Sequence, residues 1–301
     1  MVSGHRPPDE RSRAYAVPVS LYRLADPPAM VAPRLVAAFD GWVDAGAAAT
    51  RAASRLSDGG TVVATFNADL MFDYRARRPT LDIVDGRLTK LTWPELVLRH
   101  TRIDGRDVLV LTGAEPDFRW QEFADAMLEL VAQLEVAEWI SLGAIPAAVP
   151  HTRAVPILGT ASAPDLLKGD VQPGPVGLLR VPSAALSVLE MSLSRAGTPA
   201  VGYFAQVPHY VSGPYPAASL ALLQALELHL GVVIPIGSIE DEARRMRSSL
   251  DAAAAADEST RAYVERLESM VDEARLPSGN ELISEIERFL RDRGDEGSER
   301  S

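Results

Sequence analysis

Apolar residues in the first 235 positions form short runs that alternate with stretches of helical spacing. The runs are rich in Val, Leu and Ile, which is typical of strands buried on both faces of a sheet. They span Leu35–Phe39, Thr61–Phe66, Val108–Thr112, Trp139–Leu142, Val176–Leu179 and Ala200–Phe204. Helical spacing predicts helices over Ala45–Leu56, Arg119–Leu134, Ser183–Ser194 and Ala217–Leu230, the last ended by Gly231. This alternation predicts an α/β fold with a mostly parallel sheet flanked by helices.

The pattern changes after Pro235, where charged segments continue without any strand signal. We expect amphipathic helices over Ser238–Leu250, Thr260–Arg275 and Asn280–Asp292, which must lie on the core or on a neighbouring subunit. The predicted organisation is a disordered tail (1–16), an α/β core domain (17–235), a C-terminal helical extension (236–292) and a second disordered tail (293–301).

Composition and charge restrict the class of protein. The 301 residues include no cysteine, which excludes disulfides, zinc sites built on thiolates and catalysis by a cysteine nucleophile. A net charge of −11 opposes the negative backbone of nucleic acids, so we expect no nucleic-acid partner. No apolar run approaches the ~18 residues of a membrane span, and the first residues lack a secretory signal. We therefore expect no membrane partner and a cytoplasmic location.

The usual catalytic signatures are missing from the sequence. It contains no G-x-S-x-G, no H-E-x-x-H and no G-x-x-x-x-G-K, and its five histidines have no metal-binding spacing. We expect no metal and no cofactor. Whether the protein is an enzyme stays open, with a non-enzymatic role favoured.

Polar and aromatic residues follow four of the predicted strands. Because ligands of open α/β sheets bind at the carboxyl ends of the strands, we expect these loops to converge on a pocket there. The alternative is that their side chains make loop hydrogen bonds and an oligomer contact. The candidate residues are Asp40, Gly41, Trp42, Asp44 and Gly46, then Glu115, Asp117 and Trp120, then His151 and Arg153, and finally His209, Tyr210 and Tyr215.

An arginine cluster adds a second kind of candidate site. Arg75 and Arg78 flank Arg77, beside Asp73 and Tyr74, in an otherwise acidic chain. Guanidinium groups pair with carboxylates or phosphates in a bidentate manner, which indicates a site for an anion or a partner. An intramolecular ion-pair network or a subunit interface is the alternative.

The turn after the first predicted strand, "DGWVDAG", has a composition that argues against phosphate. Asp44 is placed to cap the following helix by accepting a backbone N–H two or three residues on. Gly41 permits the turn, and Gly46 allows a close approach. Since Asp44 occupies the positive end of the helix and Asp40 adds repulsion, we expect a structural role or recognition of a neutral or cationic group.

Several motifs together resemble the proteasome assembly chaperone 2 family in its actinobacterial form. They are "GWVDAGAAAT", "FDYRARRPT", "LTGAEPDFRWQEF", "GAIPAAVPHTR", "VPHYVSGPYPAA" and the C-terminal "LPSGNELISEIERFLRDR", and they span roughly residues 17 to 292. The resemblance implies a phosphorylase/hydrolase-like core and a tendency to oligomerise. For eukaryotic and archaeal relatives it implies building of, or docking to, the 20S proteasome.

One departure from the family concerns its docking tail. Relatives that dock on proteasomes often end in a hydrophobic residue, a tyrosine and one final residue, whereas this sequence ends in Ser-Glu-Arg-Ser. We therefore expect no docking of that kind. The leading hypothesis is a non-enzymatic, assembly-chaperone-like interaction protein that acts as a homo-oligomer, with proteasome subunits or another protein as partner. The alternative is a protein or enzyme that binds a nucleoside-like molecule or a carboxylate in the strand-end pocket.

Overall fold

Four parallel strands form the centre of the structure, a computed structural model that describes residues 20–174 and 177–274. They lie side by side in the order β7 (Arg106–Ala114), β2 (Arg34–Asp40), β8 (Glu138–Ala147) and β11 (Ala200–Pro208). Leu35 of β2 lies opposite Leu109 on one side and Trp139 on the other, and all three are fully buried. The apolar runs predicted in these four strands are therefore covered on both faces, as the sequence indicates.

The outer strands make the nine-stranded sheet mixed. Beyond β7 lie β6 (Leu96–Ile103), β3 (Thr61–Phe66) and β1 (Tyr22–Leu24), all in antiparallel pairing. Beyond β11 lie β9 (Ile157–Ala161), antiparallel to it, and β10 (Gln172–Pro173). The prediction of parallel pairing holds for the four central strands. On one side the pairing becomes antiparallel at the tight hairpin that joins β6 to β7, and on the other side β9 pairs antiparallel with β11.

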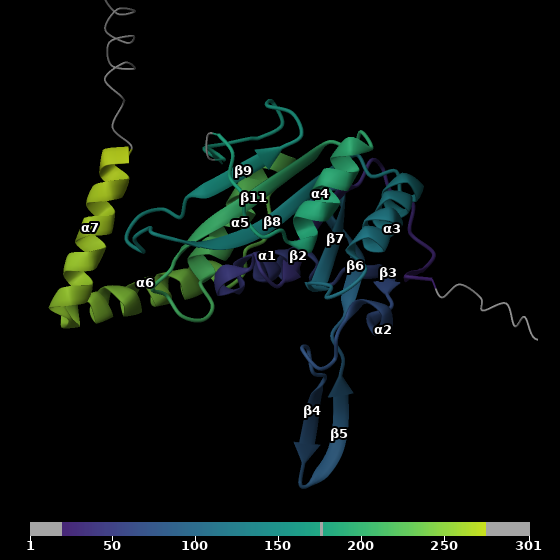
Figure 1. The fold of residues 1–301 in the computed structure, drawn as a ribbon, viewed down its shortest axis with the longest axis horizontal. Helices are drawn as coiled ribbons and strands as arrows, with labels where there is room; N and C mark the ends of the chain where they lie inside the picture. The colour runs from purple at the N-terminus through teal and green to yellow at the C-terminus, as the bar shows by residue number, and fades with distance from the viewer. Residues whose placement is uncertain (1–19, 175–176, 275–301) are drawn as a thin grey trace, which may run out of the picture.

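Helices cover both faces of the sheet and confirm the α/β fold (Figure 1). One apolar cluster joins the sheet to α1 (Ala48–Leu56) and α5 (Pro216–Leu230). The other cluster joins the opposite face to α3 (Trp120–Gln133), α4 (Ala185–Arg195) and the short α2 (Ala68–Met71). A single 3-10 turn, Ala45–Ala47, precedes α1. Gly231 ends α5 in the left-handed conformation, as predicted.

The C-terminal segment continues as two helices, α6 (Ile239–Ala256) and α7 (Glu258–Ala274). Ile239 of α6 is buried in the same apolar cluster as α5, and Met246 and Leu250 pack against that cluster. In Figure 1, α6 runs out from the core and α7 stands at an angle to it. The two predicted tails (1–16 and 293–301) and the helix predicted over Asn280–Asp292 lie outside the described residues.

Two predictions from the apolar pattern need correction. The segment predicted as a strand over Val176–Leu179 has no strand at residues 177–179, where Leu178 is 83% exposed. Gly177 lies within this segment, Gly174 and Pro182 flank it, and such residues interrupt strand pairing. The pattern also missed the hairpin of β4 (Thr80–Val84) and β5 (Arg87–Thr92), which projects from the body in Figure 1.

Among the helices that the structure describes, none has the length and the apolar character needed to cross a bilayer.

Candidate functional site

The four candidate loops lie along one edge of the sheet because the strands before them run parallel. Backbone hydrogen bonds connect the loops to one another. Glu115 N donates to Asp40 O at 3.0 Å, Tyr215 N donates to Gly46 O at 2.8 Å, and His209 N donates to Ala147 O at 3.1 Å. The candidate residues then separate into two clusters, one around Glu115 and one around His151.

Glu115 holds the first cluster together and is 8% exposed. Its Oε2 atom accepts from Trp42 N at 3.0 Å, and its Oε1 atom accepts from Ala185 N at 2.7 Å. A Cβ atom on Gly41 would lie 2.3 Å from Oε2, so this position needs glycine for close approach. Both carboxylate oxygens are thus engaged, and the side chain joins the loop after β2 to the start of α4.

Asp44 caps α1 in a different manner from the one predicted. Its Oδ1 atom accepts from Ala49 N at 2.8 Å and Thr50 N at 3.2 Å, five and six residues on. The offset is larger because the 3-10 turn intervenes, with Gly46 at φ 62° against Tyr215 and Ala47 at φ 49°. Burial raises the pKa of Asp44, while the hydrogen bonds from Thr50 and Ala49 act in the opposite direction. These N–H groups are therefore not available to a phosphate.

Asp117 and Trp120, the other candidates near Glu115, also form hydrogen bonds within the chain. Asp117 Oδ2 accepts from Asp73 N at 2.8 Å, and its Oδ1 atom accepts from Arg77 Nε at 3.4 Å. The Trp120 indole donates to Pro116 O at 2.6 Å. The intramolecular alternative thus applies to Arg77, the middle member of the arginine cluster.

Arg75 and Arg78 behave differently from Arg77. Both are exposed, and within the described part of the chain neither guanidinium has a hydrogen bond or an ion pair. Arg78 and Asp40 line a cleft of about 540 Å³ at the root of the β4–β5 hairpin. The cleft therefore contains the positive charge of Arg78 and the negative charge of Asp40.

His151 is the centre of the second cluster, and its side chain is 2% exposed. The Tyr210 hydroxyl lies 2.7 Å from both His151 N and Nδ1, so it accepts from the backbone and donates to the ring. The Nε2 atom then carries the proton and donates to Asp251 at 3.2 Å. Burial lowers the pKa of His151, with Asp251 opposing this effect.

The other candidates of this cluster bind α7. Arg153 donates to Asp272 at 2.8 Å and 3.2 Å and to Glu268 at 3.2 Å. His209 Nδ1 donates to Ala147 O at 3.0 Å, and its Nε2 atom accepts from Tyr263 at 3.1 Å. Sequence reasoning missed all of these partners on α6 and α7, because a hydrogen bond between residues 54 to 119 positions apart leaves no local pattern.

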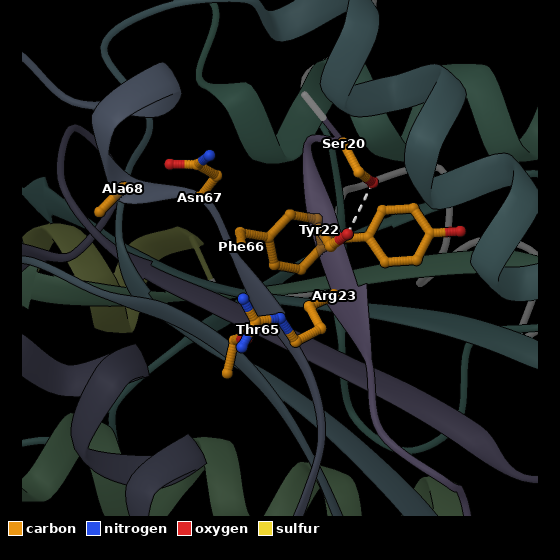
Figure 2. A pocket seen from close by; sticks show the side chains of 7 residues that line it. All are labelled: Ser20, Tyr22, Arg23, Thr65, Phe66, Asn67 and Ala68. Carbon is orange, nitrogen blue, oxygen red and sulfur yellow. Dashed lines mark hydrogen bonds between the residues drawn. The ribbon is translucent and has the colours of Figure 1, made fainter. Parts of the chain in front are cut away.

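A shallow hollow of about 500 Å³ lies at the edge of the sheet on β1 and β3 (Figure 2). Its residues are Ser20, Tyr22, Arg23, Thr65, Phe66, Asn67 and Ala68, and none is a candidate from the sequence. Ser20 donates to Tyr22 O at 2.7 Å, and Asn67 accepts from Asp69 N at 3.1 Å. The Tyr22 and Phe66 rings lie 5.9 Å apart. Ser20 and Asn67 thus serve local structure.

The family model described as the PAC2 family matches residues 38–254. The chain belongs to the PAC2 family. The resemblance stated from its sequence motifs is thereby confirmed. Comparison with curated proteins gives no match.

Solved structures of three similar proteins share the fold of this chain. A PAC2 family protein from Streptomyces avermitilis MA is 37% identical, with a TM-score of 0.68 over 77% of this chain and 99% of that chain. A proteasome-assembly chaperone homologue from Mycobacterium tuberculosis is 34% identical, with a TM-score of 0.70 over 76% and 99%. A protein of unknown function from Corynebacterium glutamicum ATCC 13032 is 33% identical, with a TM-score of 0.79 over 90% and 100%.

This PAC2 protein also exposes aromatic side chains at the strand edge, whereas most polar candidates there are hydrogen-bonded within the chain. Trp42 follows β2 and is 65% exposed, Phe118 follows β7 and is 49% exposed, and Trp93 precedes β6 and is 48% exposed. Together with the exposed Arg75 and Arg78 they form what we call the strand-end surface. Tryptophan and arginine are enriched in protein interfaces.

Proposed function

We propose that this PAC2 family protein is a non-enzymatic interaction protein with an assembly-chaperone-like role, which acts as a homo-oligomer in the cytoplasm. Family membership supports the class of function. The M. tuberculosis relative, at 34% identity, is named a proteasome-assembly chaperone homologue. By that likeness, proteasome subunits are the first partner to test.

The observation that carries the proposal is the contrast between the polar and the aromatic side chains of the strand edge. Glu115, Asp44 and His151 direct their polar atoms at backbone groups and side chains of this chain. General acid–base catalysis needs such a group within hydrogen-bond reach of a substrate. Trp42 and Phe118, by contrast, expose large apolar area at the same edge. Such a surface fits a protein partner better than a reacting small molecule.

The partner is tested by capture of 20S α-subunits with the tagged full chain from the native lysate. We expect enrichment over a control with the tag alone, and a loss of enrichment in the double variant W42S/F118S. Both side chains are about half exposed or more, so their replacement leaves the core intact. Equal α-subunit recovery with the tag alone, and unchanged proteasome maturation in a deletion strain, would remove the proteasome from the proposal.

A small-molecule site is the second candidate function, favoured by the cleft of about 540 Å³. The exposed guanidinium of Arg78 lies in this cleft and can bind a carboxylate or a nucleoside-like ligand that carries an anion. A thermal-shift screen of nucleotides, nucleosides and amino acids tests this candidate, with R78Q as the control. A ligand at 100 times its Kd adds about 2.7 kcal/mol to stability, and a screen without any shift would eliminate it.

A further inference from the structure

The β4–β5 hairpin has an apolar face that its strand register creates. Leu81 pairs with Leu91, and Ile83 pairs with Leu88. Paired residues of antiparallel strands point to the same side of the ribbon, and sides alternate along each strand. The irregularity between Asp82 and Ile83 leaves one extra residue in β5, so that a leucine rather than Thr89 lies opposite Ile83. The four apolar side chains therefore share one face.

The opposite face of the hairpin is mostly polar. Its pairs are Thr80 with Thr92, Asp82 with Lys90, and Val84 with Arg87. Opposite charges in direct cross-strand pairs stabilise the ribbon modestly. The hairpin is thus amphipathic, with Val84 as the apolar residue of its polar face.

Nothing in the described part of the chain covers the apolar face. Leu81 is 43% exposed, Ile83 60%, Leu88 72% and Leu91 48%. A two-stranded hairpin alone is marginally stable in water, and a contiguous exposed apolar patch marks an interaction site. No described residue thus buries this face, and a matching apolar surface is needed to cover it.

The root of the hairpin is fastened to the body, so the face is presented in a defined direction. The Tyr74 and Trp93 rings meet edge to face, with centroids 4.7 Å apart. Arg77, just before β4, pairs with Asp117 in the loop after β7. A fixed root lowers the ordering cost of binding through the hairpin.

We propose that the apolar face of the hairpin docks on a second copy of this chain. The proposal rests on the homo-oligomer part of the proposed function and names the element that makes it. Charge selects the occupant. Residues 75–92 carry five cations, Arg75, Arg77, Arg78, Arg87 and Lys90, against Asp82 and Asp85, which gives +3 within a chain of −11. Every copy thus combines a basic hairpin with an acidic body, and complementary potentials favour docking of one on the other.

Interface size supports docking on the body of the second copy. A stable interface takes about 20–30 residues from each partner. The strands β4 and β5 contribute five and six residues, so hairpin strands alone are too few. Direct packing of two hairpins would also bring two segments of charge +3 together. When the hairpin of each copy packs against the body of the other copy, residues from both hairpins and both bodies contribute to a single interface.

Sedimentation equilibrium of the full chain at micromolar concentration tests the proposal. We expect the wild type to have a multiple of the 32.4 kDa chain mass and the double variant I83S/L88S to have 32.4 kDa. The matched control V84S removes a similarly exposed apolar side chain from the other face, and we expect it to keep the wild-type mass. Far-UV circular dichroism verifies that all three chains are folded.

A thiol-reactivity measurement gives a second readout, because the chain has no native cysteine. The reaction of L88C with a thiol reagent slows several-fold as protein concentration rises, whereas V84C reacts at a constant rate. Wild-type mass retained by I83S/L88S would overturn the hairpin proposal and leave the homo-oligomer in place. A wild type at 32.4 kDa under all conditions would overturn both.

Discussion

Asp44 shows at the residue scale how one side chain serves the local fold of this PAC2 protein. It lies in the loop after β2, yet its carboxylate accepts from Ala49 N, from Thr50 N and from the Thr50 hydroxyl. The capping role was predictable from the Asp-Ala-Gly sequence before an alanine-rich helix. The shift of three residues relative to that prediction was not, because it arises from the left-handed conformations of Gly46 and Ala47.

Replacement of Asp44 tests this role directly. We expect D44A to lower the free energy of unfolding by about 1–2 kcal/mol, the usual range for a lost helix cap. Urea denaturation followed by circular dichroism measures the change. D58A, which removes an exposed carboxylate near the other end of α1, serves as the control with a change within about 0.5 kcal/mol. A D44A midpoint equal to that of D58A would contradict the capping role.

His151 helps to hold α6 against the core domain. Its ring contacts Tyr210 from the β11–α5 loop and Asp251 from α6, and Arg247 of α6 donates to its backbone O. Burial lowers the pKa of His151 in the folded state, with Asp251, Arg247 and Glu268 as the neighbouring charges. The unfolded chain therefore takes up this proton first as the pH falls below about 6.5.

The expected result is a loss of stability that begins just below pH 6.5 and ends once the pH has passed the folded pKa. Urea unfolding at pH 7.5 and pH 5.5 measures this loss. The variant H151Q should be less stable at pH 7.5 and should have a smaller difference between the two pH values. An equal pH dependence in H151Q and in the wild type would show that other groups cause the loss.

At the scale of elements, apolar runs predict the parallel centre and fail at the edges. β2, β7, β8 and β11 were found from the sequence because strands buried on both faces consist largely of continuous apolar residues. β3 was found as well, although Val62 is 40% exposed. The two hairpins were missed although each contains an Asp-Gly pair, Asp85-Gly86 and Asp104-Gly105, with positive φ at both residues. Asp-Gly between alternating apolar residues is a strong hairpin signal. It predicts the turn between β4 and β5 and the turn between β6 and β7.

The elements also explain which site residues sequence could assign. Parallel strand order brings the candidate loops to one edge, so the convergence of Asp40, Glu115, His151 and His209 was predictable from alternation alone. The division into two clusters was not, since it depends on α6 and α7. Those helices lie against the second cluster, with Asp251 and Tyr263 bound to its histidines. The boundary at residue 235 between core and extension stays a prediction.

At the scale of the whole molecule, charge and apolar exposure are distributed unevenly. The basic hairpin segment and the exposed Trp42 and Phe118 belong to the same edge of an acidic protein. We infer from this arrangement that one edge serves association, with the hairpin joining copies and the strand-end surface free for a partner. The described polar candidates Asp44, Glu115 and His151 do not form a closed polar pocket with free catalytic groups, because they are hydrogen-bonded within the chain.

Sedimentation velocity with purified components tests the central claim most directly. The full chain is mixed with purified proteasome α-subunits, and the sedimentation of each labelled component is followed. We predict a faster, shared boundary with the wild-type chain and with the control D58A, and separate boundaries with W42S/F118S, whose own fold and mass are unchanged. Separate boundaries with the wild type, or a shared boundary that W42S/F118S leaves intact, would contradict the account.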